Sequence, residues 1–296
     1  MSAVGTFAGD SGPSPSEAIG ADLGRRVDAF RRAARRVRGQ RDEEAVHDLR
    51  VAVRRIEAAL ALWKPLFRPR ARRRATKRLR RLRRRLGPVR ESEVVLASLG
   101  VVFASTPGLS PLRAILERAG RQVVQGRRRA SRRAAKSRIR PLAALFDRAR
   151  IDMGSRASAH PGFADDARSR ASTLLARARE RLGAALDRPD EESLHQARLA
   201  IKKWRYAGEC LIAADLSDAA RELATTRMLQ KVLGDLHDDM LVAEYVHCER
   251  ARLNPRVRDA SAALLRRFTR SAGRARQAEV ERLRSLAIRE GWIALM

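Results

Sequence analysis

Histidine and basic residues recur at the same spacing in two stretches of the sequence. Residues 42–55 (DEEAVHDLRVAVRR) return as residues 190–203 (DEESLHQARLAIKK), 148 positions later, with six of the fourteen residues unchanged. In each copy basic residues follow a histidine at i+3 and i+7, and on a helix these three side chains share one flank. Guanidinium groups in such a row are suited to forked hydrogen bonds with phosphate oxygens. The candidate phosphate-binding residues of the two copies are His47, Arg50, Arg54, His195, Arg198 and Lys202.

An apolar stripe runs beside this basic flank in both copies. With the stripe turned toward a core, the basic flank lies at the margin of that core, and Arg55 points to water. A cation at such a margin loses hydration and needs an anion there. The pattern therefore indicates a binding site for a ligand that carries phosphate groups. The residues of the two stripes are Val46, Leu49, Val53, Ile56 and Leu60, and Leu194, Ala197, Ile201 and Trp204.

A second basic helix follows each copy, and the repeat indicates which of its charges matter. At an offset of 147 positions, Arg80 aligns with Arg227 and Arg84 aligns with Lys231, whereas the neighbouring arginines align with uncharged residues. Residues at i and i+4 lie on the same face of a helix. We expect these four residues to form the second wall of a basic groove in each half. The other arginines of the first helix, Arg83 among them, are expected to be mostly solvated.

The elements that position these residues are expected to be helices. Strand signals are almost absent, and long stretches rich in Leu, Ala, Arg and Glu have a period of 3.6 residues, which predicts an all-α fold. Asp42 and Asp190 are good N-caps for the duplicated helices, and Gly87 and Gly234 are expected to end the helices that follow. The expected helices cover residues 21–38, 42–63, 71–86 and 217–233, open again at residues 90 and 237, and fill much of 109–150 and 255–290.

Positive charge dominates the composition. The 296 residues include 64 Lys and Arg against 34 Asp and Glu, a formal net charge of +30. A codon preference can favour arginine over lysine, but it does not explain why the acids are so outnumbered. The imbalance indicates a polyanionic partner, which could be nucleic acid, an anionic membrane surface or a phosphate polymer. The basic tract at residues 127–140 is expected to be a solvated helical face.

Signals for export and for membrane insertion are weak. Residues 1–20 lack the basic and apolar regions of a signal peptide, and we expect them to form a disordered tail. No apolar run approaches the length that spans a membrane. The two cysteines, Cys210 and Cys248, have no metal-ligand spacing and indicate a reducing compartment. We therefore expect a soluble cytoplasmic protein.

The neighbours of the candidate residues disfavour metal binding and catalysis. His47 and His195 are surrounded by arginine, which repels cations, and no further ligand stands at metal-binding spacing. Each histidine is left to donate to phosphate, or to a backbone carbonyl that orders the groove. Glycine-rich phosphate loops and HExxH motifs are absent. Asp238 and Asp239 are interpreted as acids at a helix start and His237 as structural, so we expect no metal, no cofactor and no catalytic residue.

The duplicated motifs also carry a family resemblance. HDLRVAVRR and LHQARLAIKKWRYAGE, each followed by a Leu-Gly pair (LGPVRESEV, LGDLHDDML), resemble the signatures of the CHAD domain, the conserved histidine α-helical domain. The resemblance covers about residues 22–290. It implies two four-helix bundles related by pseudo-twofold symmetry, a basic central groove or pore, and binding of inorganic polyphosphate, often at polyphosphate granules.

The resemblance assigns polymer contacts to the candidate residues above, with Lys203 and Arg205 as further candidates. Glu57 departs from the family pattern, because it occupies the position that Arg205 fills in the second copy. The resemblance therefore predicts that the second half binds more strongly than the first.

These observations give one predicted organisation and three ranked functions. A tail (1–20) precedes a first helical half (21–153), a linker (154–162) and a second half (163–296), which together make one domain. The predicted function is non-enzymatic binding of inorganic polyphosphate at granules. Sequence-independent nucleic-acid binding ranks second, because aromatic residues are 4% of the chain and do not interleave with the basic stripe. An accessory subunit of a polyphosphate-hydrolysing enzyme ranks third.

Overall fold

The structure, a computed structural model, describes residues 13–39, 44–105, 113–136, 139–260 and 262–294. Within these residues every regular element is a helix, so the predicted all-α class is confirmed. A short 3-10 turn, η1, lies between the second and third α-helices. The elements in chain order are α1 (Pro15–Gly39), α2 (Ala45–Leu62), η1 (Lys64–Leu66), α3 (Pro69–Ser105), α4 (Arg113–Lys136), α5 (Ile139–Ile151), α6 (Met153–Ser158), α7 (Phe163–Asp187), α8 (Glu191–Ala213), α9 (Ala220–Arg250), α10 (Pro255–Ala260) and α11 (Ala262–Arg289).

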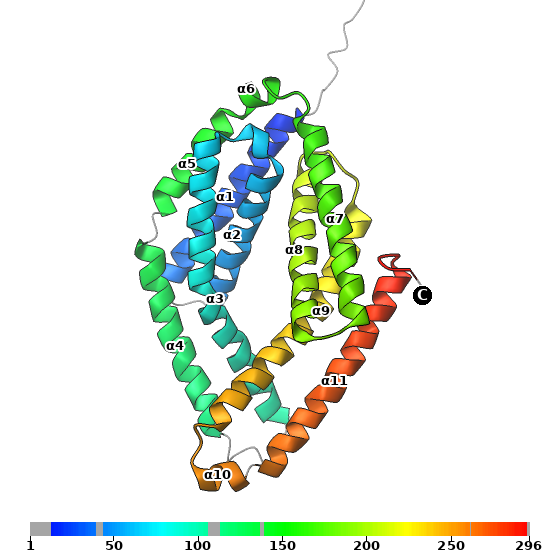
Figure 1. Cartoon of the computed structure of the whole chain (residues 1–296). Helices are drawn as coiled ribbons and strands as arrows, with labels where there is room; N and C mark the ends of the chain where they lie inside the picture. The colour runs from blue at the N-terminus through cyan, green and yellow to red at the C-terminus, as the bar shows by residue number, and fades with distance from the viewer. Residues whose placement is uncertain (1–12, 40–43, 106–112, 137–138, 261, 295–296) are drawn as a thin grey trace, which may run out of the picture.

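The helices form two groups that lie side by side (Figure 1). In the first group α1 packs on α2, α4 and α5, and α3 packs on both α2 and α4. In the second group α8 packs between α7 and α9, and α11 packs on α9. The groups meet where α2 contacts α8 and where α3 contacts α9. The two helices that carry the repeated motif are therefore neighbours in space.

The duplicated helices bury the predicted apolar stripes. Every residue of both stripes, from Val46 to Leu60 in α2 and from Leu194 to Trp204 in α8, belongs to the main core, where each is at most 4% exposed. The side chain of Asp190 accepts a hydrogen bond from the Ser193 backbone N–H at 2.8 Å, so the predicted N-cap of α8 is confirmed. The equivalent residue of the first copy, Asp42, lies outside the described residues.

The prediction that Gly87 with Pro88 and Gly234 end helices is wrong. α3 continues through Gly87 and Pro88 to Ser105, and α9 continues through Gly234 to Arg250. Residues 90 and 237 therefore lie inside helices and do not open new ones. The physical reason is packing: beyond the proline, the α3 residues Val95 and Leu99 join a second apolar cluster with residues of α4 and α9. Such burial stabilises a helix more than a local breaker destabilises it.

Other predicted boundaries also change. α1 begins at Pro15, so part of the expected tail is helical, and Ile19 is buried in the core. α6 occupies part of the expected linker at 154–162. The helices expected within 109–150 are α4 and α5, and those expected within 255–290 are α10 and α11. None of the described helices combines the length and the apolar character that crossing a bilayer requires.

Candidate anion-binding site

The basic flanks of α2 and α8 face each other where the two helices pack. Charges on α2 and α8 lie close enough to perturb each other: Arg54 contributes to lowering the pKa of both Arg198 and Lys202. We call these side chains the α2–α8 cluster. Its members are the six candidate residues of the repeat, His47, Arg50, Arg54, His195, Arg198 and Lys202, all of which are half-buried or buried.

The arginines on α2 are held by few anionic groups. Arg50 donates from Nη1 to the backbone carbonyl of Arg83 on α3, at 3.0 Å. Burial, followed by the nearby charge of Arg54, lowers the pKa of Arg50 to about 10. Burial also lowers the pKa of Arg54, which hydrogen-bonds the side chain of Tyr206 on α8. These cations have lost hydration with little compensation, which favours an incoming anion.

The cations on α8 are in a similar state. Arg198 lies 3.9 Å from the carboxylate of Asp238 on α9, while its buried Nε has no hydrogen-bond partner among the described residues. Lys202 is only 9% exposed. Burial, followed by the charges of Arg198, Arg54 and Arg205, lowers the pKa of Lys202 to about 6. An anion placed here would relieve repulsion among the cations and would restore the proton on Lys202.

Two residues beside the α2–α8 cluster, His237 and Arg90, were not selected from the sequence. The ring of His237 on α9 lies 5.4 Å from that of His195, and burial lowers the pKa of His237 to about 3. Arg90 on α3 contributes, after burial, to lowering the pKa of His47. His237 therefore lies against the cluster and inside α9, and not near a helix start. Arg90 and His237 are equivalent at the repeat offset of 147, which is the signal that could have identified them.

Asp238 is not an acid at a helix start, as predicted, because it lies inside α9. It pairs with Arg198, and burial raises its pKa. Among the described residues, no group of three or more His, Cys, Asp and Glu side chains could hold a metal ion. The acid is therefore a partner of the basic cluster.

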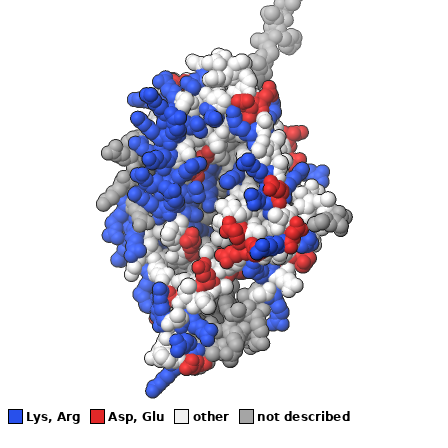
Figure 2. Space-filling model, in the orientation of Figure 1, with Lys and Arg blue, Asp and Glu red and all other residues white. Residues whose placement is uncertain are grey.

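A pocket of about 530 Å³ opens beside the cluster, between α2, α3, α7 and α8. Apolar residues of α2, α7 and α8 contribute to its lining, and eight basic residues line it as well. Figure 2 shows that lysine and arginine side chains gather over α3 and toward the middle of the molecule, whereas acidic side chains gather lower down. We call this cavity the arginine pocket; its basic residues are Arg54, Arg72, Arg80, Arg83, Arg170, Arg177, Lys202 and Lys203.

Only one of the four residues that were predicted to form the second walls lines the pocket. Arg80 lines it, whereas Arg84 and Arg227 are exposed and do not. Lys231 is 71% exposed and lies 3.8 Å from Asp235. The expectation that Arg83 is mostly solvated is wrong, because its Nε donates to Glu57 Oε2 at 3.1 Å.

The arginines of α7 in the pocket were also missed. Arg170 and Arg177 approach from a helix that carries neither copy of the motif, and the repeat gave no reason to select them. Arg170 donates from Nη1 to the carbonyl of Leu62 at 2.9 Å, which holds α7 against the end of α2. Arg72 of α3 has a buried Nε without a hydrogen-bond partner among the described residues. It therefore keeps a donor available for an anion.

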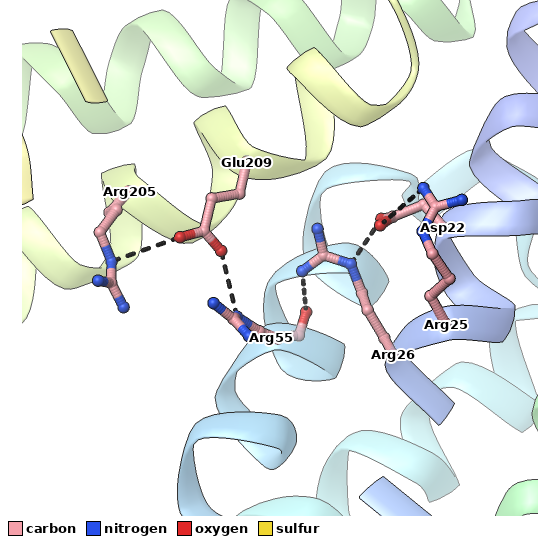
Figure 3. Close-up of polar contacts among 6 residues, drawn as sticks. All are labelled: Asp22, Arg25, Arg26, Arg55, Arg205 and Glu209. Atoms are coloured by element: carbon pink, nitrogen blue, oxygen red, sulfur yellow. Dashed lines mark hydrogen bonds and ion pairs between the residues drawn. The ribbon is translucent and has the colours of Figure 1, made fainter. Parts of the chain in front are cut away.

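Arg205 is engaged on the other side of the α2–α8 contact (Figure 3). Its Nε lies 3.7 Å from Glu209, and its guanidinium lies 4.6 Å from the centre of the Tyr206 ring. Glu209 also accepts a hydrogen bond from Arg55 of α2 at 3.2 Å. Arg55 was predicted to point to water; it is exposed, but it pairs across the contact between the helices.

This ion-pair network extends to α1. Arg26 is 7% exposed and donates to Asp22 at 2.5 Å and to the Arg55 carbonyl at 3.3 Å (Figure 3). The network joins α1, α2 and α8, and so fixes how the two basic flanks face each other. The described contacts of Arg205 are with Glu209 and Tyr206 of its own helix, whereas Lys203 lines the arginine pocket directly.

Comparisons with known proteins agree on the family and the fold. A family model described as CHAD domain matches residues 21–247. The structure of the CHAD domain from the plant Ricinus communis is similar, with a TM-score of 0.67 and 23% sequence identity over 92% of this chain and 91% of that one. The structure of PptA from Streptomyces chartreusis has a TM-score of 0.61 and 19% identity, over 92% of this chain and 99% of that one. No curated protein sequence matches this chain.

Proposed function

The chain belongs to the CHAD domain family, and from this premise we propose that it binds inorganic polyphosphate without a catalytic step. The two helices that carry the repeated motif, α2 and α8, pack on each other. We propose that the two groups are four-helix bundles related by a pseudo-twofold axis. The α2–α8 cluster and the arginine pocket would then form one basic groove near that axis.

The observation that carries the proposal is the burial of the α2–α8 cluster. Its cations lie at the margin of the core, and among the described residues Asp238 is the only carboxylate with an ion pair to one of the three repeat residues on α8. Buried cations without enough anions are unfavourable in the free protein. A polyanion that enters the cluster relieves this repulsion. The relief contributes to the free energy of binding.

A phosphate chain suits this site better than a duplex does. Three basic residues that burial desolvates, Arg54, Arg198 and Lys202, are half-buried or buried and lie in or beside a pocket between four helices. A linear phosphate chain is thin, flexible and charged at every unit, so it can follow such a recess. A DNA duplex is a wide, stiff rod that contacts exposed cations. We infer that the exposed arginines on α4, Arg128, Arg129 and Arg132, attract polyanions only loosely.

We also propose that the site binds without hydrolysis and that the protein associates with polyphosphate granules in the cytoplasm. Phosphoryl transfer commonly depends on carboxylates that hold a divalent metal against the phosphate. The acid in the wall of the arginine pocket, Glu57, is engaged with Arg83. This arrangement supports a binding role.

The test is a titration of long-chain polyphosphate at physiological salt with charge-reversal variants. We expect Arg198→Glu together with Lys202→Glu to weaken binding at least 30-fold. The matched control is Arg128→Glu with Arg129→Glu, which makes the same change of charge at exposed positions on α4, and should weaken binding less than 3-fold. Equal losses would show that general charge, and not the cluster, binds the polymer.

A competition experiment separates the second candidate. Duplex DNA added at equal phosphate concentration should leave polyphosphate bound, since the cluster is recessed. If DNA displaces polyphosphate, nucleic acid is the better ligand and the proposal fails. Release of orthophosphate in the presence of a divalent metal would instead indicate an enzyme.

A further inference from the structure

Glu57 is an acid among the basic residues of the arginine pocket. It lies on α2, one turn beyond Arg54 and on the same side of the helix, and it lines the pocket with eight cations. Its side chain is 17% exposed. Positive charges from Arg83, Arg80 and Arg54 act on it. A carboxylate in an anion-binding pocket repels anions, so its presence there affects which anion can enter.

The two carboxylate oxygens of Glu57 are in different states. Oε2 accepts a hydrogen bond from Arg83 Nε at 3.1 Å. Oε1 is buried and has no hydrogen-bond donor among the described residues. A buried acceptor without a donor is unfavourable. The last torsion of a glutamate side chain is broad, so a small rotation can turn this oxygen toward the pocket.

We propose that Glu57 makes the arginine pocket selective for a terminal phosphate group, that is, for a phosphate that still carries a hydroxyl proton. The inference rests on the proposed function and adds which part of the polyphosphate molecule the pocket binds. An internal unit of linear polyphosphate has one strongly acidic oxygen and no hydroxyl at neutral pH. A terminal unit has a second ionisation with a pKa of about 6, by analogy with other phosphate monoesters. Only the terminal unit can therefore donate a hydrogen bond to Glu57.

The surrounding cations complete this recognition. With the hydroxyl on Glu57, the remaining oxygens of the terminal phosphate face donors of Arg54, Arg80 and Arg177, which line the same pocket. Burial raises the pKa of Glu57, which brings its proton affinity closer to that of the terminal phosphate. Similar affinities strengthen a hydrogen bond between two acids that share one proton. The rest of the polyphosphate can then pass Lys202 and enter the α2–α8 cluster, because Lys202 both lines the pocket and belongs to that cluster.

The test compares two short ligands on two proteins at pH 6. The ligands are inorganic tetraphosphate with free ends and tetraphosphate with both ends esterified, which removes the hydroxyl protons. We expect the wild-type protein to prefer the free-ended ligand at least 10-fold by isothermal titration calorimetry. In Glu57→Gln the amide can donate to an unprotonated oxygen, and the preference should fall below 3-fold. Because both proteins meet the same ligand charges, the ratio of the two preferences isolates Glu57.

Two further variants guard against a folding defect and against a general charge effect. Glu57→Asp keeps the carboxylate but shortens the side chain by one methylene group. We expect an intermediate preference for the free-ended ligand. Glu91→Gln changes an exposed acid outside the pocket lining, near Arg50, and should keep the wild-type preference. A preference that is unchanged in Glu57→Gln, with the variant folded by circular dichroism, overturns the inference.

Long-chain polyphosphate distinguishes failure of this inference from failure of the proposed function. If the long chain binds but the preference for free ends does not depend on Glu57, the inference alone is wrong. If the long chain does not bind, the proposed function is wrong. The free-end preference of tetraphosphate then still reports whether the pocket recognises a phosphate hydroxyl, and its loss in Glu57→Gln would support that recognition by itself.

Discussion

At the scale of single residues, Lys202 combines burial with an accumulation of like charge. It is 9% exposed and lies near Arg198, Arg54 and Arg205, with Asp238 as the opposing charge that acts on it. An ammonium group in this position is unfavourable, so the folded protein loses the proton far more readily than the unfolded chain does. The side chain therefore links protein stability to pH and to the presence of a polyanion.

The pH dependence of stability follows from this shift. The pKa of Lys202 is about 6 in the folded protein and roughly 10.4 in an unfolded chain. Between these values the unfolded chain holds the proton and the folded protein does not, so this group makes stability rise as pH rises. Replacing it by Lys202→Met should remove up to about 2 kcal/mol of the increase in unfolding free energy between pH 6.5 and 8.5. Urea titrations at the two pH values measure the difference.

The control for this measurement is the adjacent residue. Lys203→Met removes an exposed amine from the same helix and should leave the pH dependence of the wild-type protein unchanged. If Lys202→Met also keeps the wild-type pH dependence, then Lys202 holds its proton in the folded protein. The cluster would in that case be better compensated than its geometry indicates.

The sequence could predict where the basic flanks lie but not all of their partners. Helical period alone places His47 and Arg198 beside the core, because the neighbouring stripe must be buried. Arg83 could not be selected by comparison of the repeats, since its role depends on Glu57, and the equivalent positions in the second copy are Gln230 and Arg205. A repeat identifies contacts that both halves keep. It misses contacts that one half has gained.

At the scale of helices, Gly87 and Gly234 do not end the helices that contain them, and Gly87 affects the packing around its helix. Gly87 lies inside α3, and a Cβ there would lie 3.4 Å from Arg50 Nη1, so the missing side chain leaves room for that guanidinium. No atom lies within 4 Å of the equivalent position in Gly234. The all-α class and the order of helices could be predicted from periodicity. The continuity of α3 and α9 could not, because it depends on contacts between segments far apart in the sequence.

A pair of glycine substitutions tests the packing of α8 and α9. Gly234→Ala should raise the unfolding free energy by up to about 1 kcal/mol, because alanine favours the helix and the new methyl group meets nothing. Gly208→Ala on α8 adds a methyl group 2.8 Å from Leu223, which is buried on α9. Overpacking of this kind costs about 1–3 kcal/mol. Denaturant titration should find Gly234→Ala clearly more stable than Gly208→Ala, and a reversed order would contradict the packing described.

At the scale of the whole molecule, the site lies where the two groups of helices meet. The duplicated helices bring like charges together, and the ion pair between Arg55 and Glu209 joins the groups against that repulsion (Figure 3). The chain as a whole has a formal net charge of +30. Self-repulsion of this size destabilises a compact state, especially at low salt. Fold stability and anion binding therefore depend on the same charges.

Salt should consequently have opposite effects on the free protein and on its complex. Raising NaCl from 0.1 M to 1 M shortens the screening length from about 10 Å to about 3 Å, which weakens self-repulsion. The melting temperature of the free protein should therefore rise.

The increase in melting temperature produced by polyphosphate should shrink over the same range, because salt opposes the release of counterions on binding. Differential scanning fluorimetry measures both. The double substitution Arg198→Glu with Lys202→Glu reduces the net positive charge, so the free protein should respond less to salt and the increment should be small throughout. A polyphosphate increment that persists undiminished at 1 M NaCl would mean that binding does not depend on charge, and the cationic cluster would then not be the site.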